Sequence, residues 1–253
     1  MPPEDALPGS LIPDWRAGPH VGALMSTRAG GVSAGAFDSL NLGRSAGDAF
    51  AAVDENRRRF AAALGARPVW LSQVHGTRVL RLPLDEGQAS IGADAAITTQ
   101  PGIACTVMVA DCLPVLFAAP GGSGVGAAHA GWRGLASGLL EATVTALCEA
   151  AACAPGELQA WLGPSIGPRQ FEVGADVVEA FGGGGHFVAR PRPDGALRWL
   201  ADLPGLARDR LRAAGLTHVS GGGVCTVEDR SRFFSFRRDG TTGRMAAAVW
   251  LRR

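Results

Sequence analysis

The chain has 253 residues, of which 47% are hydrophobic and 19% are charged, so it can bury a full core and is neither disordered nor fibrous. Its 24 basic and 23 acidic residues give a net charge of +1, which predicts no binding to nucleic acid or to an anionic membrane. All the basic residues are arginine, and the absence of lysine excludes Schiff-base chemistry and phosphate loops that end in Gly-Lys. The five cysteines are an odd number and no apolar signal segment opens the chain, so we expect a reduced, cytoplasmic protein.

The first half of the chain predicts an arm, a helix and a group of strands. Residues 1–20 contain five prolines and predict an extended N-terminal arm. Val53–Leu64 has the apolar spacing of a helix, with Arg57–Arg59 expected on its solvated face. Three β-favouring runs follow, with a bend at Ala110–Pro114 after the first of them: Ile103–Val109, Val115–Ala119 and Gly124–Ala130.

The second half adds helices and shorter strands. Leucines at helical spacing predict a helix within Gly134–Ala152, and a second helix is predicted at Leu203–Ala214. Short strands are predicted at Trp161–Leu162, Phe187–Ala189, His218–Val219 and Ala246–Leu251. Because helices and strands do not alternate strictly, we expect an α+β fold, a mixed α/β sandwich in which mixed β-sheet and flanking helices form a single domain over residues 1–253.

Any metal or acid–base site must draw on only five histidines. His75 and His129 each lie beside glycines at the end of a predicted strand, and Cys112 lies in the predicted bend, at the kind of edge where sites form. Two imidazoles and a thiolate suit a catalytic zinc that keeps its fourth tetrahedral position open. Their wide separation in the sequence fits equally well with structural histidines and a small buried cysteine.

Other chemistries use the same residues. With Met108 as a weak axial ligand, the three donors also describe a copper centre of a phenol oxidase. Without a metal, Cys112 and His129 form the nucleophile and base of a cysteine hydrolase that acts on an amide. A non-catalytic binding module stabilised by the metal is a further hypothesis.

A separate motif, Gly163–Gly167, matches the Gly-x-Ser-x-Gly pattern of a nucleophile elbow, with Asp202 and His218 following in the required order. In a chain with 36 glycines this short match is more typical of a turn stiffened by proline.

In a chain without lysine, arginine must bind any phosphate. Arg133 is predicted to lie where a helix begins, so its guanidinium and the exposed backbone N–H groups there suit an anion. Arg28 and Arg44 lie in glycine-rich loops from which a side chain can turn inward.

Several motifs taken in order resemble the YfiH-type family, formerly called polyphenol oxidase or laccase-domain proteins and now described as purine nucleoside phosphorylases. The resemblance runs from about Ala23 to Leu251. The motifs that carry it include Thr27–Ser33, Ser39–Gly43, Gln73–Gly76, Ala110–Val115, His129–Gly134, Gly163–Gly167, Phe171–Gly174 and Phe234–Arg238.

This resemblance implies a zinc held by His75, Cys112 and His129, and copper is the alternative metal that the ligand types allow. It also implies phosphorolysis of adenosine, guanosine, inosine and methylthioadenosine, and deamination of adenosine. Purine nucleosides and phosphate are then the expected partners. We expect Arg28 and Arg133 to hold phosphate. Asp111 is the candidate for proton transfer beside the catalytic Cys112 and His129. An amide hydrolase that acts on a peptidoglycan precursor remains the alternative.

Overall fold

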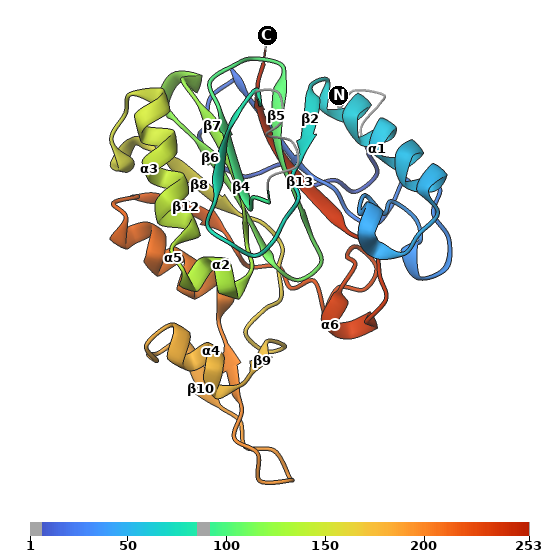
Figure 1. Cartoon of the computed structure of the whole chain (residues 1–253), viewed down its shortest axis with the longest axis vertical. Helices are drawn as coiled ribbons and strands as arrows, with labels where there is room; N and C mark the ends of the chain where they lie inside the picture. Colours follow the sequence, from blue (N-terminus) through green and yellow to red (C-terminus); the bar gives the residue numbers. More distant parts are fainter. Residues whose placement is uncertain (1–6, 85–91, 253) are drawn as a thin grey trace.

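The computed structural model describes residues 7–84 and 92–252, which form a four-layer sandwich (Figure 1). Two sheets pack face to face in the middle, and helices cover their outer faces. One sheet has the strand order β1 (Val21–Met25), β13 (Met245–Leu251), β5 (Ile103–Val109) and β2 (Arg67–Trp70). The other has the order β12 (His218–Gly221), β8 (Gln159–Leu162), β6 (Leu113–Ala118), β7 (Val125–Ala130), β4 (Ala95–Thr98) and β3 (Val79–Leu82). The mixed α/β fold predicted from the sequence is confirmed.

The helices are distributed between the two outer layers and the edges. Helix α1 (Phe50–Leu64) packs on the four-stranded sheet, whereas α3 (Leu139–Ala151) and α5 (Leu203–Ala213) cover the six-stranded sheet. Three shorter helices are α2 (Trp132–Ala136), α4 (Ala175–Ala180) and α6 (Phe236–Asp239). None of the helices within the described residues is long and apolar enough to cross a membrane.

Strand β13 shows why the central strands of the two sheets have unbroken apolar sequences. Its Met245, Ala247 and Val249 face the core between the two sheets, whereas Ala246 and Trp250 face the core under α1. Every residue of the strand is buried, because successive side chains enter different cores. Strand β13 pairs with β1 and β5, and the residue before it, Arg244, is therefore fixed at the edge of the sandwich.

The predicted strands and helices are found with two local differences. Strand β6 begins at Leu113 and includes Pro114, which was expected to end the pairing; the carbonyl of Pro114 still accepts a hydrogen bond from Gly163 N–H at 2.9 Å. The helix predicted within Gly134–Ala152 is divided into α2 and α3, because Gly138 adopts a left-handed conformation with φ of 95°.

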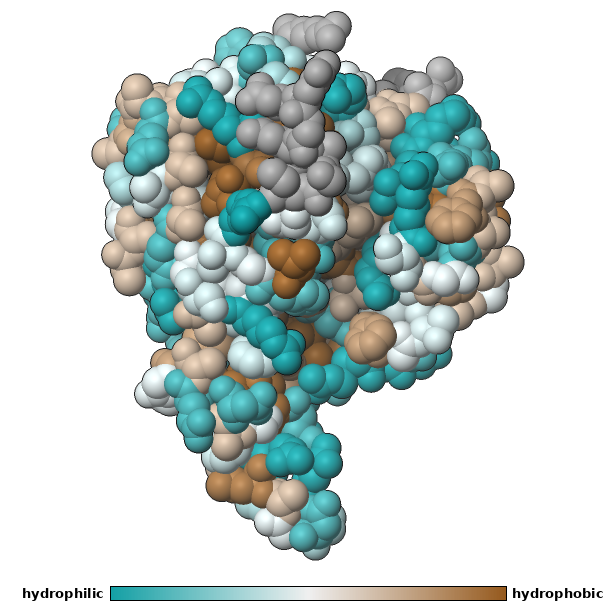
Figure 2. Space-filling model, viewed as in Figure 1, coloured by the Kyte–Doolittle hydropathy of each residue, from teal (hydrophilic) through white to brown (hydrophobic). Residues whose placement is uncertain are grey.

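A small third sheet of β10 (Phe187–Ala189), β11 (Trp199–Ala201) and β9 (Glu172–Val173) extends below the sandwich (Figure 1). In the face shown in Figure 2, hydrophobic residues form small separate patches, one of them on this extension. Val188 of β10 is 64% exposed.

The arm predicted over residues 1–20 is described only from Leu7 onward. It pairs with β1 at one point, where Leu11 and Met25 form a bridge, and its Leu7 and Ala17 are buried. The described part of this segment has little regular secondary structure, and it contributes side chains to the core. The single-domain assignment for residues 1–253 stays a prediction.

The contact of Gly22 with Trp250 gives a test of the β1–β13 pairing. A Cβ at position 22 would lie 2.2 Å from the indole ring of Trp250, which is itself buried. We expect Gly22→Ala to lower the free energy of unfolding by about 1–3 kcal/mol through overpacking. The control is Gly185→Ala, which would meet no atom within 4 Å and should be nearly neutral. Urea denaturation of both variants makes the comparison, and equal stabilities would contradict the packing described.

Candidate metal centre

Three side chains that are far apart in the sequence meet beside the bend between β5 and β6. Cys112 lies in this bend, His129 in β7 and His75 in the loop between β2 and β3. Their potential ligand atoms all lie within 4.8 Å of one another, and Cys112 Sγ lies 3.8 Å from His75 Nε2. His129 is buried and His75 is exposed, so the cluster has one closed side and one open side. This His-Cys-His cluster has the donor set of a metal site.

The buried carboxylate of Asp94, just before β4, contacts both histidine segments. Its Oδ1 accepts hydrogen bonds of 2.9 Å from His129 Nδ1 and from the backbone N–H of His75. Its Oδ2 accepts from the N–H groups of Val74 and Gly76 at 3.1 and 2.7 Å. Because an ionised carboxylate only accepts hydrogen bonds, Nδ1 of His129 carries a proton, and its Nε2 is the nitrogen that would bind a metal once it is deprotonated.

The same carboxylate stabilises an unusual backbone at His75. This residue has φ of 59°, in the left-handed region that non-glycine residues rarely adopt. Three successive N–H groups converge there on one anion, an arrangement that favours negative charge. Burial opposes the charge of Asp94, but the hydrogen bonds from His129, Gly76 and Val74 outweigh it and lower the pKa of the carboxyl group.

The charges within the cluster favour a thiolate. Burial alone would raise the pKa of Cys112, but the proximity of His129 and His75 outweighs burial and lowers it below the ordinary value. Burial likewise disfavours charge on His129, yet the Cys112 sulfur and Asp94 raise the pKa of its imidazole. The thiolate is the form of cysteine that binds a metal or attacks a substrate, so the cluster is prepared for either role.

Gly131 keeps space beside the cluster. A Cβ at this position would lie 2.8 Å from Cδ2 of His75 and 3.1 Å from Sγ of Cys112. A side chain here would press on two of the three donors, so the glycine leaves a gap that an ion can occupy. The donor set and this gap together fit a divalent cation with two nitrogen ligands and one sulfur ligand.

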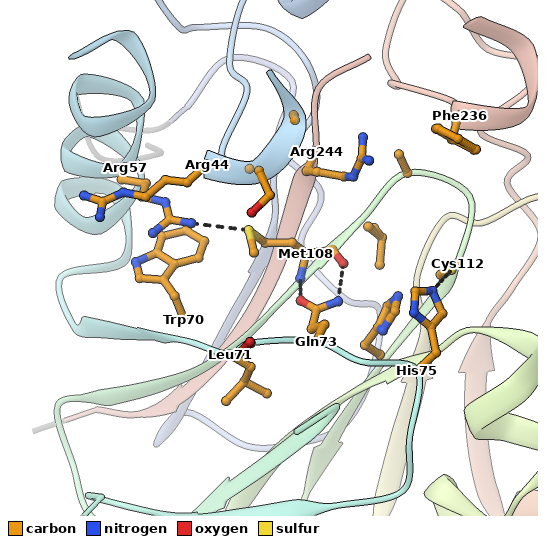
Figure 3. A pocket seen from close by; sticks show the side chains of 17 residues that line it. Arg44, Arg57, Trp70, Leu71, Gln73, His75, Met108, Cys112, Phe236 and Arg244 are labelled. Carbon is orange, nitrogen blue, oxygen red and sulfur yellow. Dashed lines mark hydrogen bonds between the residues drawn. The ribbon is translucent and has the colours of Figure 1, made fainter. Parts of the chain in front are cut away.

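The cluster opens into a cavity of about 630 Å³, a size that suits a small-molecule ligand (Figure 3). Gln73 joins two segments that line this cavity. Its side-chain amide donates to the carbonyl of Met108 at 2.8 Å and accepts from the N–H of Met108 at 2.7 Å. This pair ties the loop of His75 to β5, the strand that leads to Cys112.

Neither arginine predicted to hold phosphate lines the cavity. Arg28 donates to the carbonyl oxygens of Asp38 and Arg230 at 2.7 and 3.2 Å. Arg133 is exposed on the short helix α2, where its guanidinium stacks 4.4 Å from the ring of Trp132. These placements do not support the predicted role for either residue.

The cavity is lined by Arg44, which the sequence suggested could turn inward, and by other residues that the sequence did not indicate. Its arginines are Arg44, Arg57 and Arg244, and its aromatic rings belong to Trp70 and Phe236. Arg57 was expected on the solvated face of its helix, but its guanidinium stacks 4.1 Å from the ring of Trp70. The signal available in the sequence was the position of Arg57 on the same side of the helix as buried Val53 and Phe60.

Asp111 does not line the cavity, although it adjoins Cys112 in the chain. Its Oδ1 accepts from the hydroxyl of Thr226 at 2.6 Å, and its Oδ2 accepts from the hydroxyl of Ser235 at 3.0 Å and the N–H of Arg237 at 2.6 Å. These contacts anchor the bend at Cys112 to two C-terminal loops. The placement does not support the proton transfer predicted for Asp111.

The Gly-x-Ser-x-Gly motif does not assemble a catalytic triad. Ser165 is only 1% exposed. Asp202 caps α5 by accepting from Gly205 N–H at 3.0 Å, and His218 is exposed and contacts the hydroxyl of Thr217. The motif is a turn that follows β8, as its proline and glycines favoured.

We expect Asp94→Asn to raise the dissociation constant of a bound metal by about 10- to 100-fold, because the amide cannot accept all of the hydrogen bonds that orient His129 and His75. Competition with a coloured chelator measures this constant. The control is Asp229→Asn, which alters another multiply hydrogen-bonded carboxylate away from the cluster and should leave metal affinity unchanged. Equal affinities for the wild type and Asp94→Asn would contradict the orienting role.

Comparisons with known proteins give the family. Residues 22–252 match the family described as multi-copper polyphenol oxidoreductase laccase. A purine nucleoside phosphorylase of Pseudomonas aeruginosa is 51% identical over 247 residues, covering 95% of this chain and 98% of the relative. The purine nucleoside phosphorylase YfiH of Escherichia coli is 49% identical over 243 residues, with coverage of 95% and 98%.

Two solved structures are also similar to this chain over nearly its whole length. The Neisseria meningitidis protein NMB0706 superposes with a TM-score of 0.87 at 44% identity and covers 96% of this chain and 99% of its own. YlmD from Geobacillus stearothermophilus has a TM-score of 0.85 at 34% identity, with 94% of both chains covered. The names of the relatives support an enzymatic role. With a His-Cys-His cluster that lines a cavity and this likeness over nearly its whole length, the chain belongs to the YfiH family of laccase-like proteins.

Proposed function

We propose that the protein is a zinc-dependent purine nucleoside phosphorylase that cleaves adenosine, guanosine, inosine and methylthioadenosine and also deaminates adenosine. The observation that carries this proposal is the His-Cys-His cluster at the wall of a cavity of about 630 Å³. A cavity of this size accommodates a nucleoside together with a small co-substrate. The names of the similar P. aeruginosa and E. coli proteins support the reaction type.

His75, Cys112 and His129 would hold the metal. When bound, a divalent ion supplies Lewis-acid stabilisation of negative charge and lowers the pKa of a water. Asp94 keeps the imidazole of His129 in the orientation and tautomer that ligation requires. The thiolate of Cys112 gives the site a negative charge that partly offsets the cation.

Phosphorolysis itself needs few covalent groups from the protein. An oxygen of phosphate forms a bond to the anomeric carbon of the ribose, the bond from that carbon to N9 breaks, and its electron pair leaves with the purine, which takes up a proton. The site must therefore hold an anion, a sugar with developing positive charge and a departing base in line. In deamination, water replaces the amino group at C6 and ammonia leaves.

Zinc is favoured over a copper centre by the surroundings of Met108. The sulfur of Met108 accepts from Nη2 of Arg57 at 3.6 Å, and Figure 3 shows this contact on the side of Met108 away from His75 and Cys112. A blue-copper site would need that sulfur as its axial ligand. The chain also has only five histidines, too few for several copper centres.

A second candidate is favoured by one observation. The lowered pKa of Cys112, with the sulfur 3.8 Å from Nε2 of His75, is the arrangement of a thiolate nucleophile with an imidazole partner. Such a site would hydrolyse an amide, for example in a peptidoglycan precursor. The two candidates differ in their need for metal, since a thiol hydrolase keeps its activity when metal is removed.

The test is release of hypoxanthine from inosine and phosphate by metal-loaded protein. We expect Cys112→Ala to slow release by more than about a hundredfold, because it removes a proposed ligand. The control Cys153→Ala, at a partly exposed cysteine after α3, should keep wild-type activity. A chelator should abolish release and added zinc should restore it. Release at the same rate from the Cys112→Ala variant would refute the proposal, and amide hydrolysis that survives chelation would favour the second candidate.

A further inference from the structure

Apart from the donor cluster at Cys112, the charged side chains that line the cavity are basic. Three arginines line the cavity, and no aspartate or glutamate is among its lining residues in the described part of the chain. Of these three arginines, Arg44 forms an ion pair of 2.5 Å with Asp54 at the surface. Neither of the other two, Arg57 and Arg244, takes part in an ion pair with any described carboxylate.

These two guanidiniums are partly withdrawn from water. Nη1 of Arg244 donates to the backbone carbonyls of Thr242 and Gly243 at 2.8 and 3.1 Å, and Nε of Arg57 donates to the carbonyl of Leu42 at 2.9 Å. Burial lowers the pKa of Arg57 to about 10 and also lowers that of Arg244. Arg57 therefore remains charged at neutral pH, as does any arginine in a protein.

A desolvated cation that forms no direct ion pair with a carboxylate is costly, whereas a hydrogen-bonded anion beside it is stabilising. The backbone around Arg244 is also fixed in advance, since its N–H donates to the side chain of Asn41 at 2.9 Å and its carbonyl accepts from Leu42 N–H at 3.0 Å. In Figure 3 the side chain of Arg244 lies between Arg57 and the cluster at Cys112. The wall is therefore organised for an anion near the metal ligands.

We propose that Arg244 binds the phosphate co-substrate inside the cavity, beside the metal ligands, and that Arg57 contributes positive charge from the far end of the same wall. This inference rests on the proposed function for the identity of the anion. It replaces Arg28 and Arg133, whose guanidiniums lie outside the cavity lining. Phosphate held at Arg244 shares the cavity with the ligand set, as attack on a nucleoside bound there requires.

The steady-state test varies phosphate at saturating inosine. Arg244→Gln should raise KM for phosphate about ten- to a hundredfold, the effect of losing hydrogen bonds to a charged group, and change KM for inosine less than about twofold. Arg244→Lys, which keeps the charge but loses the planar fork, should give a smaller increase. The control Arg58→Gln removes the neighbouring guanidinium of α1, which is exposed and pairs with Glu55, and should leave both constants unchanged. Thermal unfolding confirms that each variant is folded.

Two results would overturn the assignment: an unchanged phosphate KM in Arg244→Gln, or an increase of this size in Arg133→Gln. Calorimetric titration with inorganic phosphate separates this inference from the proposed function. If no nucleoside is cleaved but phosphate binds the wild type and binds Arg244→Gln at least tenfold more weakly, the subsite stands and the proposed reaction fails. If the wild type and the Arg244→Gln variant bind phosphate equally, the proposed phosphate subsite is refuted, whichever reaction the protein catalyses.

A phosphate ester presents the same chemistry as free phosphate, and inosine 5′-monophosphate distinguishes the two. If Arg244 serves free phosphate, the nucleotide should bind no more tightly than inosine in the presence of saturating phosphate. Binding of the nucleotide at least tenfold more tightly than inosine, with the advantage lost in Arg244→Gln, would assign the arginine to a substrate phosphate and overturn the proposal.

Discussion

The carboxylate of Asp94 is buried at the start of β4 and accepts four hydrogen bonds, three from successive N–H groups of the His75 loop and one from the ring of His129. A buried carboxylate is stable only with such a set of donors. Each donor belongs to a segment that carries a metal ligand or adjoins one. One anion therefore determines the backbone of His75 and the tautomer of His129 together, and the donor cluster depends on it more than on any other contact.

The layers of the fold bring the remaining parts to the same place. The bend between β5 and β6 leads from one central sheet into the other and carries Cys112 at the crossing. The side chain of Gln73 ties the His75 loop to β5, and Asp111 ties the bend to the C-terminal loops. Because β13 pairs with β5, the arginine that precedes it lines the same cavity as the donor cluster. The site is thus built on strands whose positions the two hydrophobic cores fix.

Sequence patterns predicted the parts of the structure that depend on local or repeated features. The strand at Ile103–Val109 is found with the same bounds, since an apolar β-favouring run is what a strand buried on both faces requires. The grouping of His75, Cys112 and His129 came from their residue types and from the family resemblance. Asp94 was missed because a single aspartate before an apolar run resembles an ordinary strand start.

Two arginines of the cavity, Arg57 and Arg244, were not predicted from the sequence for a different reason. Adjacent residues of a helix point about 100° apart, so the run Arg57–Arg59 is not one surface: Arg57 turns to Trp70 while Arg58 and Arg59 pair with Glu55. Arg244 enters the site only through long-range strand pairing, which no local pattern encodes.

The most direct test of the central claim, that His75, Cys112 and His129 form a metal site, is X-ray absorption at the zinc edge of metal-loaded protein. The account predicts one zinc per chain with two nitrogen donors near ~2.0 Å and one sulfur donor near ~2.3 Å. A spectrum without sulfur in the first shell, or a protein that retains no stoichiometric zinc, would contradict it.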